Sequence, residues 1–209
     1  MRKTLAVQPV GCLHGGLATP NSHHHHRRYS SRWTDEDARA LADLLGQSCS
    51  AGCELLDLGG GDGRLAALLA SATGCHATVV DQDSDAVGIA GSLEGVSAVC
   101  ADAGALPFAD GSFDAVILFD ALHHMPDRAN VPREVARVLR PGGTVVVGEL
   151  DPGSVRVQLI GLSEKLVGEQ PAFLERDECA SLFAAADVEG RCQDAGPGSY
   201  VFRGVKVGR

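Results

Sequence analysis

The sequence of 209 residues lacks several features that mark particular classes of protein. It has no run of about 18 apolar residues, the length that a membrane-spanning helix needs, so we expect no membrane segment. The short apolar patch near the start is broken by Gln8 and Pro9, and we expect no signal peptide and a cytoplasmic location. Its seven cysteines contain no C-x-x-C pair, which predicts reduced thiols and no metal site.

Basic residues are scarce beyond the start of the chain. Residues 1–33 hold five basic residues and no acid, whereas the remainder holds 13 basic against 27 acidic residues, a net charge of −14. Such an acidic body disfavours nucleic acid as a partner and favours a small-molecule substrate.

The chain is rich in glycine, above all in residues 54–70, which read ELLDLGGGDGRLAALLA. An apolar run leads into four glycines within five positions, and apolar residues then recur at helical spacing. This pattern predicts a buried strand, a tight turn and a helix. Glycine lets the backbone adopt positive φ and approach a ligand closely, and the start of the helix offers unpaired N–H groups.

The spacing of the glycines separates the known ligand-binding turns. No Lys-Ser or Lys-Thr follows, which excludes a phosphate P-loop. The dinucleotide pattern G-x-G-x-x-A is met only by Gly61, Gly63 and Ala66, two residues inside the turn, and it leaves a nicotinamide-dependent oxidoreductase as an alternative. The pattern that fits from the start of the turn is D-x-G-x-G-x-G, Asp57 to Gly63, although Asp57 could also be an ordinary capping acid.

Strands and helices alternate between residues 54 and 150. Further strands are predicted to end at Asp81 and to cover 96–101, 113–119 and 144–150, with helices from Thr34, over 84–90 and over 132–139. This alternation predicts an α/β fold with a doubly wound, mostly parallel sheet, whose ligands bind at the carboxyl ends of the strands. Four acids lie at such ends: Asp57, Asp81, Asp102 and Asp120.

The two ends of the chain carry weaker signals. Residues 1–26 are predicted to be a poorly structured tail, with His23–His26 as low-complexity sequence rather than a metal site, and residues 27–209 to be a single domain. Helices are predicted over 155–167 and 175–186, and strands over 188–192 and 200–207.

Taken together, five segments resemble the class I S-adenosylmethionine (SAM) methyltransferases, specifically the small-molecule enzymes of the menaquinone-biosynthesis type. They are DLGGGDG, VVDQD, CADAGALPF, FDAVILFDALHHMPD and EVARVLRPGGTVVVGEL. The resemblance covers about residues 41–207. It implies a Rossmann-like sheet of seven strands whose last two strands pair antiparallel.

The resemblance also implies which residues hold the cofactor SAM. The glycine turn (Asp57, Gly59, Gly61, Gly63) would pass beneath its methionine part, and Asp81 would bind its ribose. The acid that follows a strand at this distance along the chain suits a ribose independently, although an ordinary loop acid is the alternative. Asp102 and Ala103 would meet the adenine, as would Gln82, where the family often has an apolar residue. Phe119 and Asp120 would lie beside the transferred methyl group, with Asp120 toward the substrate.

A proton acceptor is needed only if the methyl acceptor carries a proton. His123 and His124 follow the fourth strand and are candidates, since histidine titrates near neutral pH. The sequence does not separate the two, and both could instead only shape the loop. Tyr29, Trp33 and Arg28 are candidates for a lid over the substrate, and Trp33 could equally belong to the core.

The sequence therefore predicts SAM-dependent methyl transfer to a small molecule in secondary or cofactor metabolism. One alternative is a protein of the same fold that binds SAM but catalyses another reaction, such as a cyclisation, or none. The oxidoreductase is a second, and arsenic methylation a third, although no thiol trio is recognisable.

Overall fold

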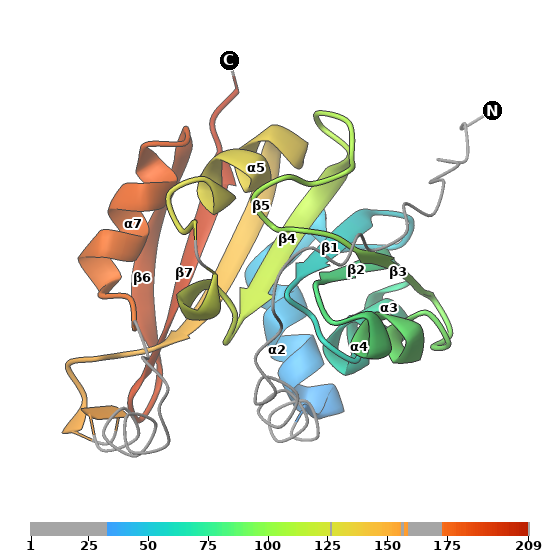
Figure 1. Cartoon of the computed structure of the whole chain (residues 1–209), viewed down its shortest axis with the longest axis horizontal. Helices are drawn as coiled ribbons and strands as arrows, with labels where there is room; N and C mark the ends of the chain where they lie inside the picture. Colours follow the sequence, from blue (N-terminus) through green and yellow to red (C-terminus); the bar gives the residue numbers. More distant parts are fainter. Residues whose placement is uncertain (1–32, 126, 156, 159–172, 209) are drawn as a thin grey trace.

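The computed structural model describes residues 33–125, 127–155, 157–158 and 173–208, and these form a sheet with helices on both faces (Figure 1). The strands are β1 (Glu54–Leu58), β2 (His76–Asp81), β3 (Val96–Cys100), β4 (Phe113–Phe119), β5 (Leu139–Leu150), β6 (Val188–Gly196) and β7 (Ser199–Lys206). The helices are α2 (Asp35–Leu45), α3 (Arg64–Thr73), α4 (Ser84–Ala90), α5 (Val131–Val138) and α7 (Arg176–Ala184), with short 3-10 turns η2 (Gly46–Ser48) and η3 (Leu122–His124).

The seven described strands run in the order β3-β2-β1-β4-β5-β7-β6. The pairs β1–β2, β1–β4, β2–β3 and β4–β5 are parallel. Strand β7 is antiparallel to both of its neighbours, β5 and β6. The predicted fold class, a doubly wound and mostly parallel seven-stranded sheet with an antiparallel end, is confirmed. The order reverses between β1 and β4, and that reversal is where such sheets bind ligands.

Successive residues of β1 serve two different cores. Leu55 joins the core beneath α2, α3 and α4, whereas Leu56 and Leu58 join the core beneath α5 and α7. Side chains alternate between the faces of a strand, so a strand covered on both faces is apolar throughout. The helices of the two cores lie on opposite sides of the sheet in Figure 1.

Helix α2 begins where the sequence predicts. The Thr34 hydroxyl accepts the N–H of Asp37 at 3.2 Å, and the Asp37 carboxylate accepts the N–H of Thr34 at 2.9 Å. This reciprocal capping box satisfies two N–H groups that have no partner within the helix. Gly46, with φ 60°, follows the last helical residue.

Strand β5 differs from the prediction, because it begins at Leu139 rather than at residue 144. Phe113 of β4 is paired with Leu139 and Ala115 with Thr144, so the four residues Arg140 to Gly143 bulge opposite a single residue of β4. The helix does end before this Pro-Gly-Gly segment, as predicted, since α5 ends at Val138. The chain is nevertheless paired with β4 both before and after the segment. Strand β6 is also longer than predicted and reaches Gly196.

Several predictions fall outside the described residues: the tail 1–26 with its histidines, Arg28, Tyr29 and most of the predicted helix 155–167. The single domain over 27–209 stays a prediction. Among the described cysteines, Cys49, Cys53, Cys75, Cys179 and Cys192 are free, as expected. Cys100 is disulfide-bonded, so the expectation of reduced thiols is wrong at that position.

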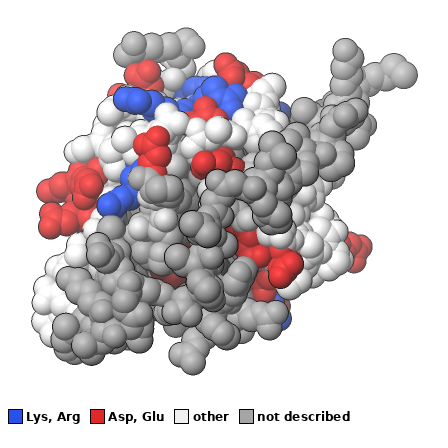
Figure 2. All heavy atoms as spheres, viewed as in Figure 1, with Lys and Arg blue, Asp and Glu red and all other residues white. Residues whose placement is uncertain are grey.

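None of the helices in the described part of the chain has the length and apolar character needed to cross a membrane. On the face shown in Figure 2, acidic side chains are spread over several areas, whereas the basic ones gather mainly near the upper rim. This distribution agrees with the acidic balance of the sequence.

Candidate functional site

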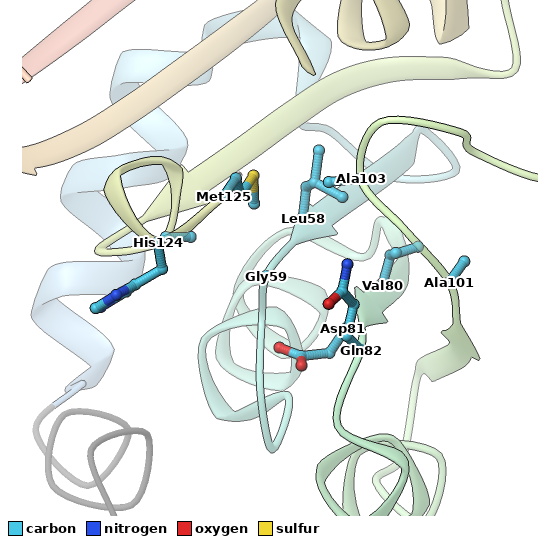
Figure 3. A pocket seen from close by; sticks show the side chains of 10 residues that line it. Leu58, Gly59, Val80, Asp81, Gln82, Ala101, Ala103, His124 and Met125 are labelled. Carbon is cyan, nitrogen blue, oxygen red and sulfur yellow. The ribbon is translucent and has the colours of Figure 1, made fainter. Parts of the chain in front are cut away.

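A cavity opens at the carboxyl ends of β1 and β2, beside the reversal of strand order (Figure 3). Its walls come from the glycine turn, the ends of β2 and β3 and the segment after β4. The lining residues are Leu58, Gly59, Val80, Asp81, Gln82, Ala101, Ala103, Ala121, His124 and Met125. The cavity therefore lies where the fold class predicts a ligand.

The first half of the glycine turn leaves no room for side chains. Gly59 has φ 76°, and a Cβ atom placed on it would lie 2.7 Å from the Cβ of Ala121. A Cβ on Gly60 would lie 2.5 Å from the carboxyl carbon of Asp57. The backbone of this half of the turn passes between Asp57 and the segment after β4. Gly59 also lines the cavity.

The second half of the turn has two different tasks. Gly61, with φ 53°, donates its N–H to Oδ2 of Asp81 at 2.9 Å. Gly63, with φ 76°, precedes α3, and a Cβ there would lie 2.8 Å from the Cβ of Ala90 in α4. Of the glycines proposed for cofactor binding, Gly59 thus lines the cavity, whereas Gly63 lets α3 and α4 pack closely.

Asp81 is the polar centre of the cavity. It is 7% exposed and directs its carboxylate toward the glycine turn (Figure 3). Oδ2 accepts the N–H of Gly61, and Oδ1 accepts the N–H of Asp83 at 2.9 Å. Each carboxylate oxygen has capacity for a further donor. Asp81 therefore holds the turn in place and can still accept hydrogen bonds from a ligand.

Asp57 lies beneath the turn rather than in the cavity wall. It is 2% exposed, and its Oδ2 has no hydrogen-bond partner among the described residues. Burial is the main cause that raises the pKa of Asp57 to about 7, followed by the nearby carboxylates of Asp81 and Asp62. A nearby cation would lower this pKa and favour the ionised form, so a cationic ligand and the ionisation of Asp57 would stabilise each other.

Of the residues expected near an adenine, some line the cavity and one does not. Ala103 is buried and lines the cavity, and Gln82 lines it from the end of β2. Asp102 is exposed, and its Oδ1 accepts the N–H of Gly104 at 2.8 Å. In this structure, the Asp102 side chain thus stabilises its own turn and is absent from the cavity lining.

Phe119 and Trp33 form an aromatic pair outside the cavity lining. Their ring centroids are 5.3 Å apart at an interplanar angle of 83°, and both rings pack against the core beneath α2. A Cβ on Gly148 of β5 would overlap the Phe119 ring, so glycine at that position makes room for it. Of the two locations that the sequence left open for Trp33, the packing favours the core.

The structure separates the two histidines. His124 is exposed and lines the cavity, whereas His123 is 7% exposed and its Nδ1 lies 2.6 Å from Oε2 of Glu149. Nε2 of His123 lies 3.8 Å from Oδ1 of Asp120, which has the left-handed φ of 53° at the end of β4.

Sequence reasoning missed Glu149 as a partner of this site. A signal was available, because an acid stands near the end of the apolar run TVVVGEL and charged side chains are rarely buried unless paired. Within the described residues, no group of three or more His, Cys, Asp or Glu could hold a metal ion.

Comparison with known proteins agrees with this geometry. Residues 56–147 match the family described as methyltransferase domain. The chain is 38% identical over 138 residues to 27-O-demethylrifamycin SV methyltransferase of Amycolatopsis mediterranei, which covers 62% of this chain and 51% of that protein. The chain thus spans about half the length of this curated relative.

Two solved structures share the fold. A SAM-dependent methyltransferase of Thermotoga maritima, described as a possible histamine N-methyltransferase, superposes with a TM-score of 0.70 at 23% identity, over 87% of this chain and 94% of that one. The 4+2 cyclase SpnF superposes with a TM-score of 0.69 at 21% identity, over 83% and 81%. Residues 56–147 therefore match a methyltransferase domain, and the predicted resemblance to the class I SAM-dependent methyltransferases is confirmed.

Proposed function

We propose that the protein transfers a methyl group from SAM to an oxygen, nitrogen or carbon atom of a small molecule in secondary or cofactor metabolism. The observation that carries the proposal is the cavity between the glycine turn and Asp81, built within the segment that matches a methyltransferase domain. The similarity to a small-molecule methyltransferase supports the class of substrate.

The residues present fit SAM. It carries a sulfonium and an ammonium charge, which suit the carboxylate of Asp81 in the cavity wall and the unpartnered buried carboxyl oxygen of Asp57 beneath the turn. A side chain at Gly59 or Gly60 would collide with Ala121 or Asp57. Because both positions are glycine, the backbone of the turn can lie against a ligand. The fit is therefore one of charge and of backbone access.

Each residue of the site has a proposed part in holding the cofactor. Gly59 and Gly61 would support the methionine part, and Asp81 would accept hydrogen bonds from the ribose. The further proposed contacts are Gln82, Asp102 and Ala103 at the adenine and Phe119 beside the methionine. When bound, SAM supplies a methyl group that its sulfonium already activates, so the protein's main contribution is alignment.

A proton must be removed when the acceptor is a hydroxyl or an amine. Two routes suit the geometry: His124, which lines the cavity, and Asp120, which has His123 behind it. We also propose that Asp120 and Tyr29 lie toward the substrate, whereas Trp33 packs with Phe119 against the core beneath α2. Tyr29 falls outside the described residues.

Calorimetric titration with SAM and with NADPH tests the choice of cofactor. We expect SAM to bind and NADPH not to bind, and binding of NADPH alone would instead favour an oxidoreductase. SAM with an isotopically labelled methyl group, incubated with a panel of small phenols, hydroquinones and amines, then tests the reaction. Tight SAM binding without any labelled product would favour the alternative of a protein of this fold with another reaction, as the cyclase among its structural relatives illustrates.

A further inference from the structure

Two buried thiols are in contact near the amino ends of β1 and β2. Cys75 directly precedes β2, and Cys49 belongs to the loop of residues 46–53 that joins α2 to β1. They are 4% and 5% exposed, and both belong to the core beneath α2. The cavity described above lies at the carboxyl ends of the same strands, so the thiol pair is at their opposite end.

The hydroxyl group of Thr73 lies between the two cysteines. Its Oγ1 accepts the backbone N–H of Cys75 at 3.2 Å, and Sγ of Cys49 lies 3.8 Å from the same oxygen. The two thiols are also hydrogen-bonded to each other. Thiols in hydrogen-bond contact are close enough for a disulfide to form after a small movement of their side chains.

Backbone hydrogen bonds hold the two segments against each other. Gly52 donates its N–H to the carbonyl of Gly74 at 2.9 Å, and His76 donates its N–H to the carbonyl of Cys53 at 2.8 Å. Glu54 is then paired with His76 in the parallel register of β1 and β2. The separation of the segments that carry the two thiols is therefore set by the backbone.

Cys53, the other cysteine of this loop, has different surroundings. It is half-buried, and its Sγ lies 3.2 Å from Oγ of Ser50 and 3.7 Å from the carbonyl oxygen of Gln47. These contacts are within its own loop, whereas the thiol of Cys49 contacts Cys75 across to β2. The geometry therefore selects Cys49 as the partner of Cys75.

The hydrogen bond between the thiols makes them chemically unequal. The bond from the Cys49 thiol is the main cause that lowers the pKa of Cys75 to about 7, although burial acts in the opposite direction. The same bond, followed by burial, raises the pKa of Cys49. Because the thiolate is the nucleophile in thiol–disulfide exchange, Cys75 is the attacking group at neutral pH and Cys49 the thiol that reacts second.

We propose that Cys49 and Cys75 form a thiol–disulfide exchange site, and that their oxidation ties the loop after α2 to the start of β2. The oxidant is a low-molecular-weight disulfide. The Cys75 thiolate attacks one of its sulfur atoms, and the other sulfur leaves as a thiolate. Cys49 then loses its proton to solvent and attacks the Cys75 sulfur, which releases the second small thiol. Two protein thiols are oxidised, and one small disulfide is reduced to two thiols.

Oxidation should stabilise the loop between α2 and β1. Cys49 is buried, whereas its neighbours Gln47, Ser50 and Ala51 are exposed, so the Cys49 side chain holds the loop against the core. Because both thiols are buried, exchange requires the loop to open, and the disulfide then prevents that opening. A covalent link between residues 49 and 75 also restricts the unfolded chain, which raises the temperature of unfolding.

Glutathione disulfide is the probe that tests this site. Reduced full-length protein is incubated with it, the remaining thiols are alkylated under denaturing conditions, and the peptides are mapped by mass spectrometry. We expect a crosslink between Cys49 and Cys75 and a midpoint of thermal unfolding raised by roughly 5–15 °C. The rate of crosslinking should rise with pH and level off above about 7, because it follows the thiolate of Cys75.

Two variants and a second thiol pair serve as controls. Cys49→Ala should accumulate the mixed disulfide of Cys75 with glutathione and lose the rise of the midpoint. Cys53→Ala, in the same loop, should keep both the crosslink and the rise. Cys179 and Cys192 are also hydrogen-bonded to each other, between α7 and β6, but burial raises the pKa of both, so they should crosslink more slowly at pH 7.

Three results would overturn the inference. Recovery of both Cys49 and Cys75 as alkylated thiols after the incubation would show that wild-type protein does not form the disulfide. A crosslink from Cys75 to Cys53 would contradict the assigned pair. A Cys49–Cys75 crosslink without any rise of the midpoint would refute the stabilising role. None of these measurements involves SAM, so they leave the proposed methyl transfer to its own test.

Discussion

Replacing Asp57 by asparagine should make the protein more stable at neutral pH. Asp57 is 2% exposed, and its Oδ2 has no hydrogen-bond partner among the described residues. Burial is the main cause that raises its pKa from 3.8 to about 7, followed by the carboxylates of Asp81 and Asp62. Asparagine has nearly the same shape without the charge, so the substitution removes the electrostatic cost of ionisation with little change in packing.

The size and the pH range of the effect follow from proton linkage. Below pH 3.8 the carboxyl group is protonated in both the folded and the unfolded chain, and it has no effect on the pH dependence. Between pH 3.8 and about 7 only the unfolded chain releases the proton, so the free energy of unfolding falls by about 1.4 kcal/mol per pH unit. Above pH 7 the loss levels off at roughly 4 kcal/mol.

Urea unfolding between pH 4 and pH 8 measures this loss. Relative to Asp57→Asn, the wild-type protein should lose stability as the pH rises through this range, and the two curves should run parallel above pH 7. Glu189→Gln, on the exposed strand β6, serves as the control and should follow the wild-type curve. A constant difference between wild type and Asp57→Asn at every pH would refute the reasoning, because it would mean that Asp57 ionises normally in the folded protein.

Three further substitutions test the structure around the site. Asp81→Ala removes the acceptor that holds Gly61 and that we propose for the ribose, so calorimetry should show SAM binding weakened by roughly 1.5–3 kcal/mol; unchanged affinity would mean that the ribose is held elsewhere. Gly148→Ala places a methyl group in the ring of Phe119 and should cost about 1–3 kcal/mol in urea unfolding, and a neutral effect would show that the ring can move aside. Arg137→Gln removes the guanidinium that donates to two loop carbonyls before β4, and thermal unfolding should show a loss of about 2 kcal/mol, whereas no loss would mean that the loop is held by other contacts.

The order of the elements could be predicted because each strand in this sheet is an apolar run with its own stop signal. The strand at 113–119 was predicted at the bounds that β4 has, and the helix over 84–90 at those of α4. The start of β5 was not predictable, because Arg-Pro-Gly-Gly is a stop signal in sequence and a bulge only when β4 lies beside it. Local propensity describes the chain, but the neighbouring strand supplies the hydrogen bonds that decide where pairing begins.

The sequence alone determined that acids stand at the ends of β1 and β2 and that glycines form the turn between β1 and α3, since these depend on residues close together in the chain. Only the tertiary structure decided that His123 is buried against Glu149 while His124 lines the cavity, and that Gly63 serves helix packing. Neighbouring residues in a short turn point in different directions, and their surroundings come from strands and helices distant in sequence. The partner of a buried histidine is therefore set by which strand lies alongside.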